Sequence, residues 1–81
     1  MDFDVLEARY IGGYTIWLRF RDGTEGGIDL GPELRGGIFE PLREVEVFRR
    51  FLIDPEGCSI VWTNGASFAP EFLQDNIRVA T

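Results

Sequence analysis

The sequence contains no histidine, no lysine and a single cysteine, Cys58. Histidine is the commonest general base and the commonest metal ligand, so its absence excludes serine–histidine and cysteine–histidine catalysis by the isolated chain. One cysteine can form neither an intramolecular disulfide nor a cysteine-based metal cage, which agrees with a reducing compartment. We therefore expect no enzyme activity, no catalytic residue, no cofactor and no metal site.

Basic residues are also scarce. Eight arginines stand against 14 aspartates and glutamates, which gives a net charge of −6. Such a field repels phosphate backbones, so we expect no direct binding of nucleic acid. No apolar run approaches the roughly 20 residues that a membrane span needs, and the acidic start Met1–Asp4 is unlike a secretory signal. These features predict a cytoplasmic protein without membrane contact.

The composition is that of a globular protein, with 44% hydrophobic and 27% charged residues among 81. A chain of this length buries only about 60% of the surface that it exposes when unfolded. The sequence shows no internal repeat and no linker long enough to separate two domains. We therefore expect one small domain, residues 1–81, of marginal stability.

The central pattern is a hairpin over residues 14–30. Apolar side chains occupy every second position from Tyr14 to Phe20, which is typical of an amphipathic strand. A two-residue turn at Asp22-Gly23 would place Asp29 opposite Ile16, whereas a three-residue loop with a left-handed glycine places Ile28 there. The second register keeps the apolar face continuous, and we favour it.

A further strand precedes this hairpin. Residues 5–11 alternate, with Leu6, Ala8 and Tyr10 on the predicted apolar face, and Gly12-Gly13 turns the chain. Strands at about 5–11, 14–20 and 24–30 would form an antiparallel meander. The segment 31–37 is rich in turn residues and predicts a loop with one helical turn. Asp29 is expected to cap this loop.

In the second half of the chain, the spacing of apolar residues changes from that of a strand to that of a helix. Leu42, Val45 and Phe48 are spaced as on one face of a helix, so we predict a short amphipathic helix within 41–50 that lies across the apolar face of the sheet. A break near Glu44 remains an open alternative. Residues 51–53, the turn 54–57 and the segment from Cys58 predict a strand, a turn and a strand.

The C-terminal hairpin is predicted around Asn64-Gly65, which suits a type I′ turn between strands 58–63 and 66–69. This turn would pair Thr63 with Ala66. Trp62 and Cys58 are then expected to be buried, and residues 70–74 can form one helical turn. The predicted fold class is α+β: an antiparallel sheet, made of a three-stranded meander plus a C-terminal hairpin, packed against one short amphipathic helix.

Several short stretches together resemble a family of small bacterial proteins catalogued as domain of unknown function 2442. They are Phe20 before Asp22-Gly23, the triplet Ile28-Asp29-Leu30, Phe39 with Pro41-Leu42, Phe48, the strand Ile60-Val61-Trp62 with Asn64-Gly65, and Ala69-Pro70-Glu71. The resemblance implies an α+β fold, no established activity and no catalytic residues.

The resemblance also implies a gene context. Members are often encoded beside another small protein in a toxin–antitoxin-like arrangement, and some carry a DNA-binding helix-turn-helix domain after this one. The sequence in hand ends before any such extension, so we carry no DNA-binding role over to it.

Trp17, Arg19 and Arg21 share the polar face of the second strand, and a tryptophan beside arginine is favoured at protein–protein interfaces. These three residues are our candidate interaction site. The alternative is that Trp17 packs beneath the N-terminal or C-terminal segment.

Two functional hypotheses follow. The first is a non-enzymatic protein-interaction module, the acidic antitoxin-like partner of a small neighbouring protein or a self-associating homodimer joined through a free strand edge or face. The second is a small-molecule sensing or regulatory domain, because the aromatic content of 14% could line a pocket between sheet and helix.

Overall fold

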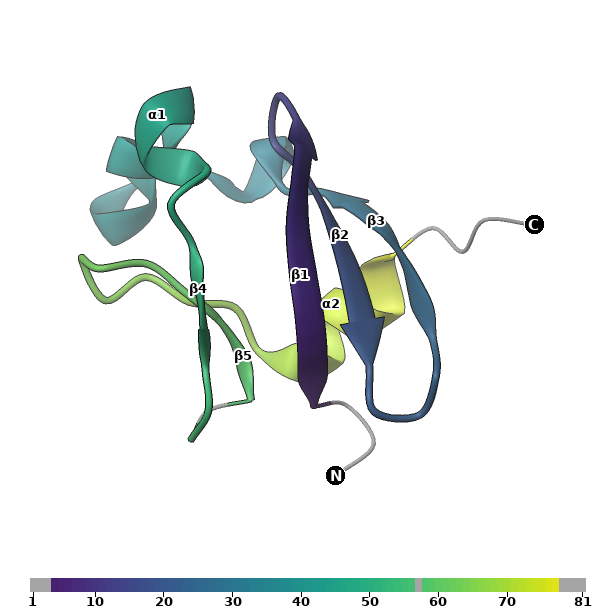
Figure 1. Ribbon diagram of the computed structural model, residues 1–81. Helices are drawn as coiled ribbons and strands as arrows, with labels where there is room; N and C mark the ends of the chain where they lie inside the picture. Colours follow the sequence, from purple (N-terminus) through teal and green to yellow (C-terminus); the bar gives the residue numbers. More distant parts are fainter. Residues whose placement is uncertain (1–3, 57, 78–81) are drawn as a thin grey trace.

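The computed structural model describes residues 4–56 and 58–77 and shows an α+β fold with antiparallel sheets, which confirms the predicted fold class (Figure 1). A three-stranded sheet in the order β1-β2-β3 stands beside a two-stranded sheet, β4-β5. The strands are β1 (Val5–Gly12), β2 (Thr15–Phe20), β3 (Glu25–Asp29), β4 (Leu52–Asp54) and β5 (Ser59–Val61). The helical elements are the 3₁₀ helices η1 (Gly31–Glu33) and η2 (Gly37–Arg43), and the α-helices α1 (Val45–Phe48) and α2 (Pro70–Asn76).

The turn between β2 and β3 has the predicted three-residue loop. Ile16 pairs with Ile28, and the N–H of Phe20 donates to the carbonyl of Thr24 at 2.8 Å. Gly23 has a φ of 91°, a conformation that L side chains rarely adopt. The N–H of Thr24 also donates to the Asp22 carboxylate at 2.9 Å. The predicted register is therefore confirmed, and Gly23 is required by the turn.

Strand β1 departs from the predicted alternation. Val5 pairs with Phe20 but Ala8 pairs with Leu18, so an extra residue lies between them, and the pairing shifts again near Ile11. Such a bulge turns one side chain out of the regular pattern. Leu6 is 43% exposed, so its predicted place on the apolar face is wrong, and Val5 is buried there instead.

The turn at Asn64-Gly65 repeats the geometry of the first turn. The N–H of Trp62 donates to the carbonyl of Ala66 at 2.9 Å, and Gly65 has a φ of 93°. The N–H of Ala66 donates to the side chain of Asn64 at 3.0 Å. The loop thus has three residues, so the predicted type I′ turn and its pairing of Thr63 with Ala66 are wrong.

The strand predicted after this turn is much reduced. In the described part of the chain, the segment 66–69 contributes a single bridge, between Ser67 and Val61. The two-stranded hairpin is formed by β4 and β5 instead, with Ile53 opposite Ile60. The predicted strand, turn and strand over residues 51–63 therefore supply the second sheet.

The helix predicted within 41–50 is divided. Glu44 is extended, with φ −78° and ψ 117°, and separates η2 from the four-residue α1, which confirms the alternative of a break. Pro41 lies inside η2, where it has no N–H to continue an α-helical ladder. None of the described helices is long and apolar enough to cross a membrane.

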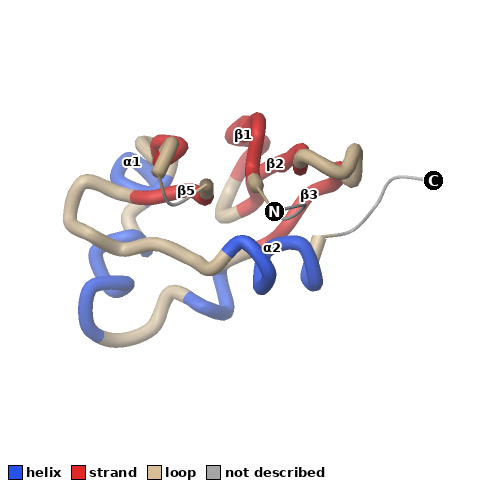
Figure 2. Tube along the Cα trace, turned by 90° about the horizontal axis from the view of Figure 1, so that it is seen from below, coloured by secondary structure: helices blue, strands red, loops and turns tan. Residues whose placement is uncertain are grey.

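The helix that covers the sheet is α2. Figures 1 and 2 show α2 against one face of β1-β2-β3, while α1 lies to the side, next to the β4-β5 hairpin. The prediction that the helix within 41–50 lies across the sheet is therefore wrong. The reason is length: α1 is too short to cover the sheet, whereas α2 runs two residues beyond the predicted Gln74 and buries Leu73 completely.

The core joins the two sheets through aromatic rings. Phe48 lies 5.4 Å from Tyr14 and 5.7 Å from Trp62, and Phe68 lies 5.9 Å from Trp62 and 5.7 Å from Phe72, centroid to centroid. Trp62 is 3% exposed and its indole N–H donates to the carbonyl of Phe48 at 2.8 Å. The predicted burial of Trp62 is confirmed.

Two adjacent residues of β2 give a direct test of which face of the sheet is covered. Leu18 is completely buried, so Leu18→Ala should lower the free energy of unfolding by about 2–5 kcal/mol. Trp17 points to the other face, so Trp17→Ala should change it by less than about 1 kcal/mol. Urea melts of both variants measure the difference, and equal destabilisation would mean that both faces are covered.

Candidate functional site

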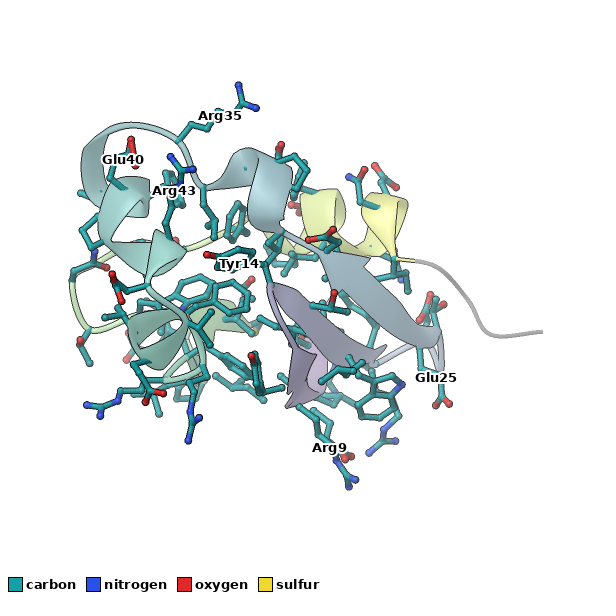
Figure 3. The ribbon with its side chains drawn as sticks, turned by 90° about the horizontal axis from the view of Figure 1, so that it is seen from above. Arg9, Tyr14, Glu25, Arg35, Glu40 and Arg43 are labelled. Carbon is teal, nitrogen blue, oxygen red and sulfur yellow. The ribbon has the colours of Figure 1, made fainter. Side chains whose placement is uncertain are left out.

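The face of the three-stranded sheet opposite α2 is the candidate site, and we call it the outer face. Strand pairing builds it, because side chains that alternate with the buried Ile16 and Leu18 must point to this side. Figure 3 shows Arg9 and Glu25 on the side away from α2. The outer face consists of Glu7, Arg9, Ile11, Thr15, Trp17, Arg19, Glu25, Gly27 and Asp29.

Trp17 occupies the centre of the outer face. It is half-buried, with Arg9 opposite it on β1 and Gly27 opposite it on β3. The Arg9 guanidinium lies 5.6 Å from the centre of the indole ring, which is cation–π geometry. Since Gly27 has no side chain, the β3 side of the ring has no cross-strand cover from that position.

Figures 1 and 2 show no described helix or loop across the face of β1-β2-β3 that lies opposite α2, and strand pairing places Trp17 on this face. The alternative that a terminal segment covers it involves residues 1–3 and 78–81, which lie outside the described residues.

The arginines of this region are each held by a carboxylate. The Glu7 carboxylate forms ion pairs with the guanidinium groups of Arg9, at 2.8 Å, and Arg19, at 3.0 Å. Since Arg19 is on β2, this glutamate links β1 to β2. Arg21 lies in the turn after β2 and pairs with Asp4 at 3.1 Å. The structure thus brings Trp17 and Arg19 together with Arg9, while Arg21 belongs to a separate ion pair beyond the end of the strand.

Arg9 is the residue that the sequence reasoning missed. It alternates with apolar residues on its own strand, but its place over Trp17 depends on the register of β1 against β2. The bulge at Leu6 sets that register.

The ion pairs shift the titration of their carboxylates. The hydrogen bond from Arg19 is the main cause that holds the pKa of Glu7 below its ordinary value, and Arg9 adds to it. For Asp4, partial burial raises the pKa, but hydrogen bonds from Arg21 and Cys58 outweigh it and leave the pKa lowered. Both carboxylates are therefore charged at neutral pH, and the arginines stay fixed in place.

Cys58 is half-buried and takes a left-handed conformation, with a φ of 58°. Its predicted role as a buried hydrophobe is therefore wrong. Burial and the neighbouring Asp4 carboxylate raise the pKa of the thiol, which keeps it protonated. The charge of Arg21 acts in the opposite direction but does not outweigh these two causes.

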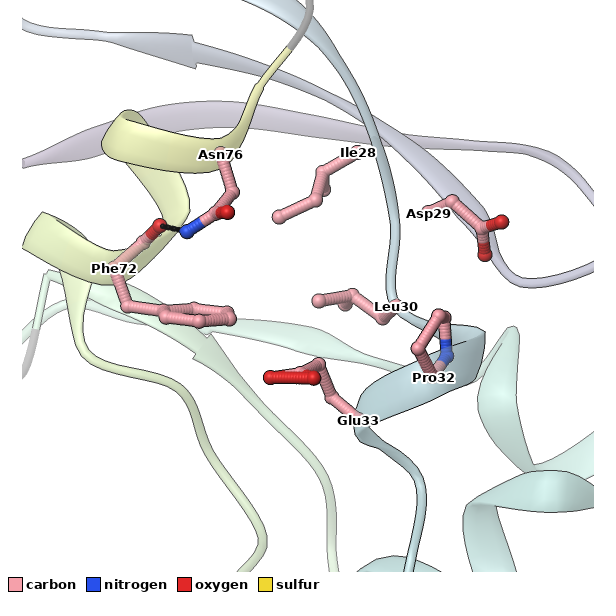
Figure 4. A pocket seen from close by; sticks show the side chains of 7 residues that line it. All are labelled: Ile28, Asp29, Leu30, Pro32, Glu33, Phe72 and Asn76. Atoms are coloured by element: carbon pink, nitrogen blue, oxygen red, sulfur yellow. Dashed lines mark hydrogen bonds between the residues drawn. The ribbon is translucent and has the colours of Figure 1, made fainter.

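A pocket of about 340 Å³ opens on the opposite side of β3, between its C-terminal end, η1 and α2. Figure 4 shows Ile28, Leu30 and Phe72 facing one another across it, while Asp29 points away. Asp29 accepts the N–H of Gly31 at 2.9 Å, which confirms its predicted capping role. The remaining lining residues are Pro32, Glu33 and Asn76.

Comparison with protein-family models matches residues 5–78 to a family described as "Protein of unknown function (DUF2442)". The match covers nearly the whole chain. This chain belongs to the DUF2442 family. Neither the comparison with curated proteins nor the comparison with solved structures found a match. Among residues 4–56 and 58–77 of this DUF2442 protein, no three histidine, cysteine or acidic side chains gather to hold a metal ion.

The charge network on the outer face can be tested through Glu7. Arg19→Gln should raise the pKa of Glu7 more than Arg9→Gln does, because Arg19 is the largest cause of the lowering. A folded-state pKa below the unfolded-state value means that Glu7 stabilises the fold above the unfolded-state pKa, and that this stabilisation is lost as the pH falls below about 4.

Carbon-detected NMR titration of the Glu7 carboxyl group measures both pKa shifts. Arg49→Gln is the matched control, since Arg49 pairs with Glu46 in α1 instead. A Glu7 titration that is identical in all three variants and the parent would contradict the network.

Proposed function

We propose that this DUF2442 protein is a non-enzymatic protein-binding module that presents its outer face to a protein partner. The observation that carries the proposal is the position of Trp17, half-exposed at the centre of a sheet face that no described segment covers. Tryptophan and arginine are the residues most enriched where interfaces concentrate their binding energy.

The outer face is also preorganised for binding. Glu7 fixes Arg9 and Arg19 from two strands, and Arg9 fixes the Trp17 ring from above. Side chains that are already ordered lose less conformational entropy when a partner binds. A rigid sheet therefore supports a binding role better than a flexible loop would.

The proposed partner is the small protein encoded beside this one, with the present chain as the acidic, antitoxin-like member of the pair. The net charge of −6 supports this assignment, because an acidic protein attracts and orients a basic partner. We expect the complex to form in the cytoplasm, where a single cysteine ordinarily stays reduced. Self-association as a homodimer through the same face is the competing form of this proposal.

Co-expression with the neighbouring gene product, followed by size-exclusion chromatography and light scattering, tests the proposal. We expect a complex that Trp17→Ala weakens at least about tenfold, as expected for a tryptophan at the centre of an interface. Ile38→Ala is the matched control, since Ile38 is an apolar residue 49% exposed on η2. Separate elution of two folded proteins, with this chain monomeric, would overturn the proposal.

The second candidate function is the sensing of a small molecule. The pocket beside α2 favours it, because the half-buried Phe72 and the polar side chains of Glu33 and Asn76 can contact one ligand. Phe72 contributes the aromatic surface of this pocket.

A ligand that binds only the folded state raises the melting temperature. A thermal-shift screen of common metabolites should therefore find at least one that stabilises the protein, and Phe72→Leu should reduce the shift. Ile53→Leu, a conservative change at a partly exposed position of β4, is the control. A screen without any stabilising compound would count against the sensing function.

A further inference from the structure

Strand β3 leaves a row of backbone groups open at the edge of the sheet. The N–H of Phe20 bonds to Thr24 at one end, and the N–H of Leu30 bonds to Tyr14 at 2.9 Å at the other end. Antiparallel pairs alternate between bonded and non-bonded. Between these ends, Gly26 and Ile28 must therefore point their backbone groups at β2, whereas Glu25, Gly27 and Asp29 point theirs outward.

The opposite edge of the sheet is partly closed. The N–H of Val5 on β1 donates to the carbonyl of Cys58 at 2.9 Å, and the β4-β5 hairpin stands beside β1 (Figure 1). In the part of the chain that the structure describes, no hydrogen bond reaches the outward groups of β3. Natural sheets protect such an edge with lysine, proline or a covering segment. Strand β3 contains neither lysine nor proline.

We propose that β3 is completed by an extended strand of the protein partner, with basic side chains four residues apart and a large apolar side chain midway between them. This inference rests on the proposed binding function and specifies its chemistry. Added strands gain affinity from backbone hydrogen bonds and specificity from alternate side chains.

The acidic residues of β3 determine where the proposed partner strand carries its basic side chains. Glu25 and Asp29 are both exposed and four residues apart on the same side of the strand, and neither is in an ion pair within the described residues. Opposite charges on facing strands stabilise pairing, and like charges oppose it. A strand with lysine or arginine at matching positions satisfies both carboxylates.

Gly27 defines the central position. It lies midway between the two carboxylates and beside Trp17, and a Cβ placed there would only come within 3.6 Å of Thr15 and 3.8 Å of Ile11. Crowding therefore does not require glycine here, and the missing side chain leaves room beside the indole. A large apolar side chain opposite a strand glycine can fill that room, as aromatic residues do in sheets.

The same charges disfavour a second copy of this chain as the occupant. If two β3 strands paired antiparallel with all three outward residues used, Glu25 of one copy would lie opposite Asp29 of the other. Like charges directly opposite each other destabilise a strand pair. The acidic edge of β3 therefore favours pairing with a basic strand over pairing with β3 of a second copy.

The experiment uses the full chain and a synthetic peptide, Thr-Lys-Thr-Phe-Thr-Lys-Thr, with capped ends. Isothermal titration should show binding, and amide exchange by NMR should slow at Glu25, Gly27 and Asp29. A peptide with glutamate at both lysine positions should bind at least about tenfold more weakly, which is the combined effect of reversing two cross-strand charge pairs. Equal affinity for both peptides, or no binding of the basic one, would overturn the proposal.

Two variants of β3 and one control variant elsewhere test whether the peptide binds at the edge of β3. Glu25→Lys should weaken peptide binding about tenfold or more, whereas Glu56→Lys makes the same charge change in the exposed turn after β4 and should alter it less than about twofold. Gly27→Val should keep or raise the melting temperature, because valine favours strands, yet it should weaken peptide binding by filling the space beside Trp17. Unchanged binding in both Glu25→Lys and Gly27→Val would overturn the site.

The co-expressed partner separates this inference from the proposed function. A complex that Trp17→Ala weakens but that Glu25→Lys and Gly27→Val leave intact would overturn strand addition while supporting the outer face as the interface. A peptide-free dimer with protected β3 amides would overturn the inference in favour of a second copy.

Discussion

The hydrogen bond from the Trp62 indole to the carbonyl of Phe48 holds together parts of the chain that are far apart in sequence. Both residues are buried, and their rings belong to a row that runs from Tyr14 on the meander to Phe72 on α2. A buried indole N–H without an acceptor would be costly, so this contact fixes where α1 can lie. The hairpin, α1 and the sheet are positioned around it.

This arrangement leaves the two faces of the three-stranded sheet chemically different. The inner face is completed by α2, with Leu73 fully buried against the apolar side chains of the core. Ring contacts of Phe48 with Tyr14 and Trp62 place α1 and the β4-β5 hairpin beside β1, and neither element extends over the outer face. A domain this small lacks the chain length to cover both faces. The outer face with Trp17 is the side that the described residues leave uncovered.

The same geometry makes the two edges of the sheet unequal. The edge of β1 adjoins the hairpin and donates a hydrogen bond from Val5 to the carbonyl of Cys58, whereas the outward groups of β3 have no bond within the described residues. Arginines paired with Glu7 lie toward the β1 side of Trp17, and the carboxylate of Glu25 lies on the β3 side. The proposed partner would therefore meet an asymmetric surface, which would give its approach a defined direction.

Elements whose causes are local could be predicted from the amino-acid sequence. The alternation from Tyr14 to Phe20, the three-residue loop at Gly23 and the cap by Asp29 follow from side-chain period, a left-handed glycine and a carboxylate two residues before an N–H. The burial of Trp62 also follows from the pattern of its strand, as does membership of the fold class. The local pattern indicates each of these features, even where, as at Trp62, the side chain then packs against distant residues.

Features that depend on contacts across the chain could not be predicted in this way. The bulge at Leu6 and the place of Arg9 over Trp17 follow from matching β1 to β2, which its own alternation cannot reveal. At Asn64 the two turn types share one sequence signature, and the side-chain bonds to Ala66 and to the carbonyl of Ile38 accompany the three-residue loop. The helix that covers the sheet was decided by which helix could bury its apolar residues there. Each of these outcomes depends on the relative free energy of alternative contacts between distant segments. A local sequence pattern describes only one of the two segments that make such a contact.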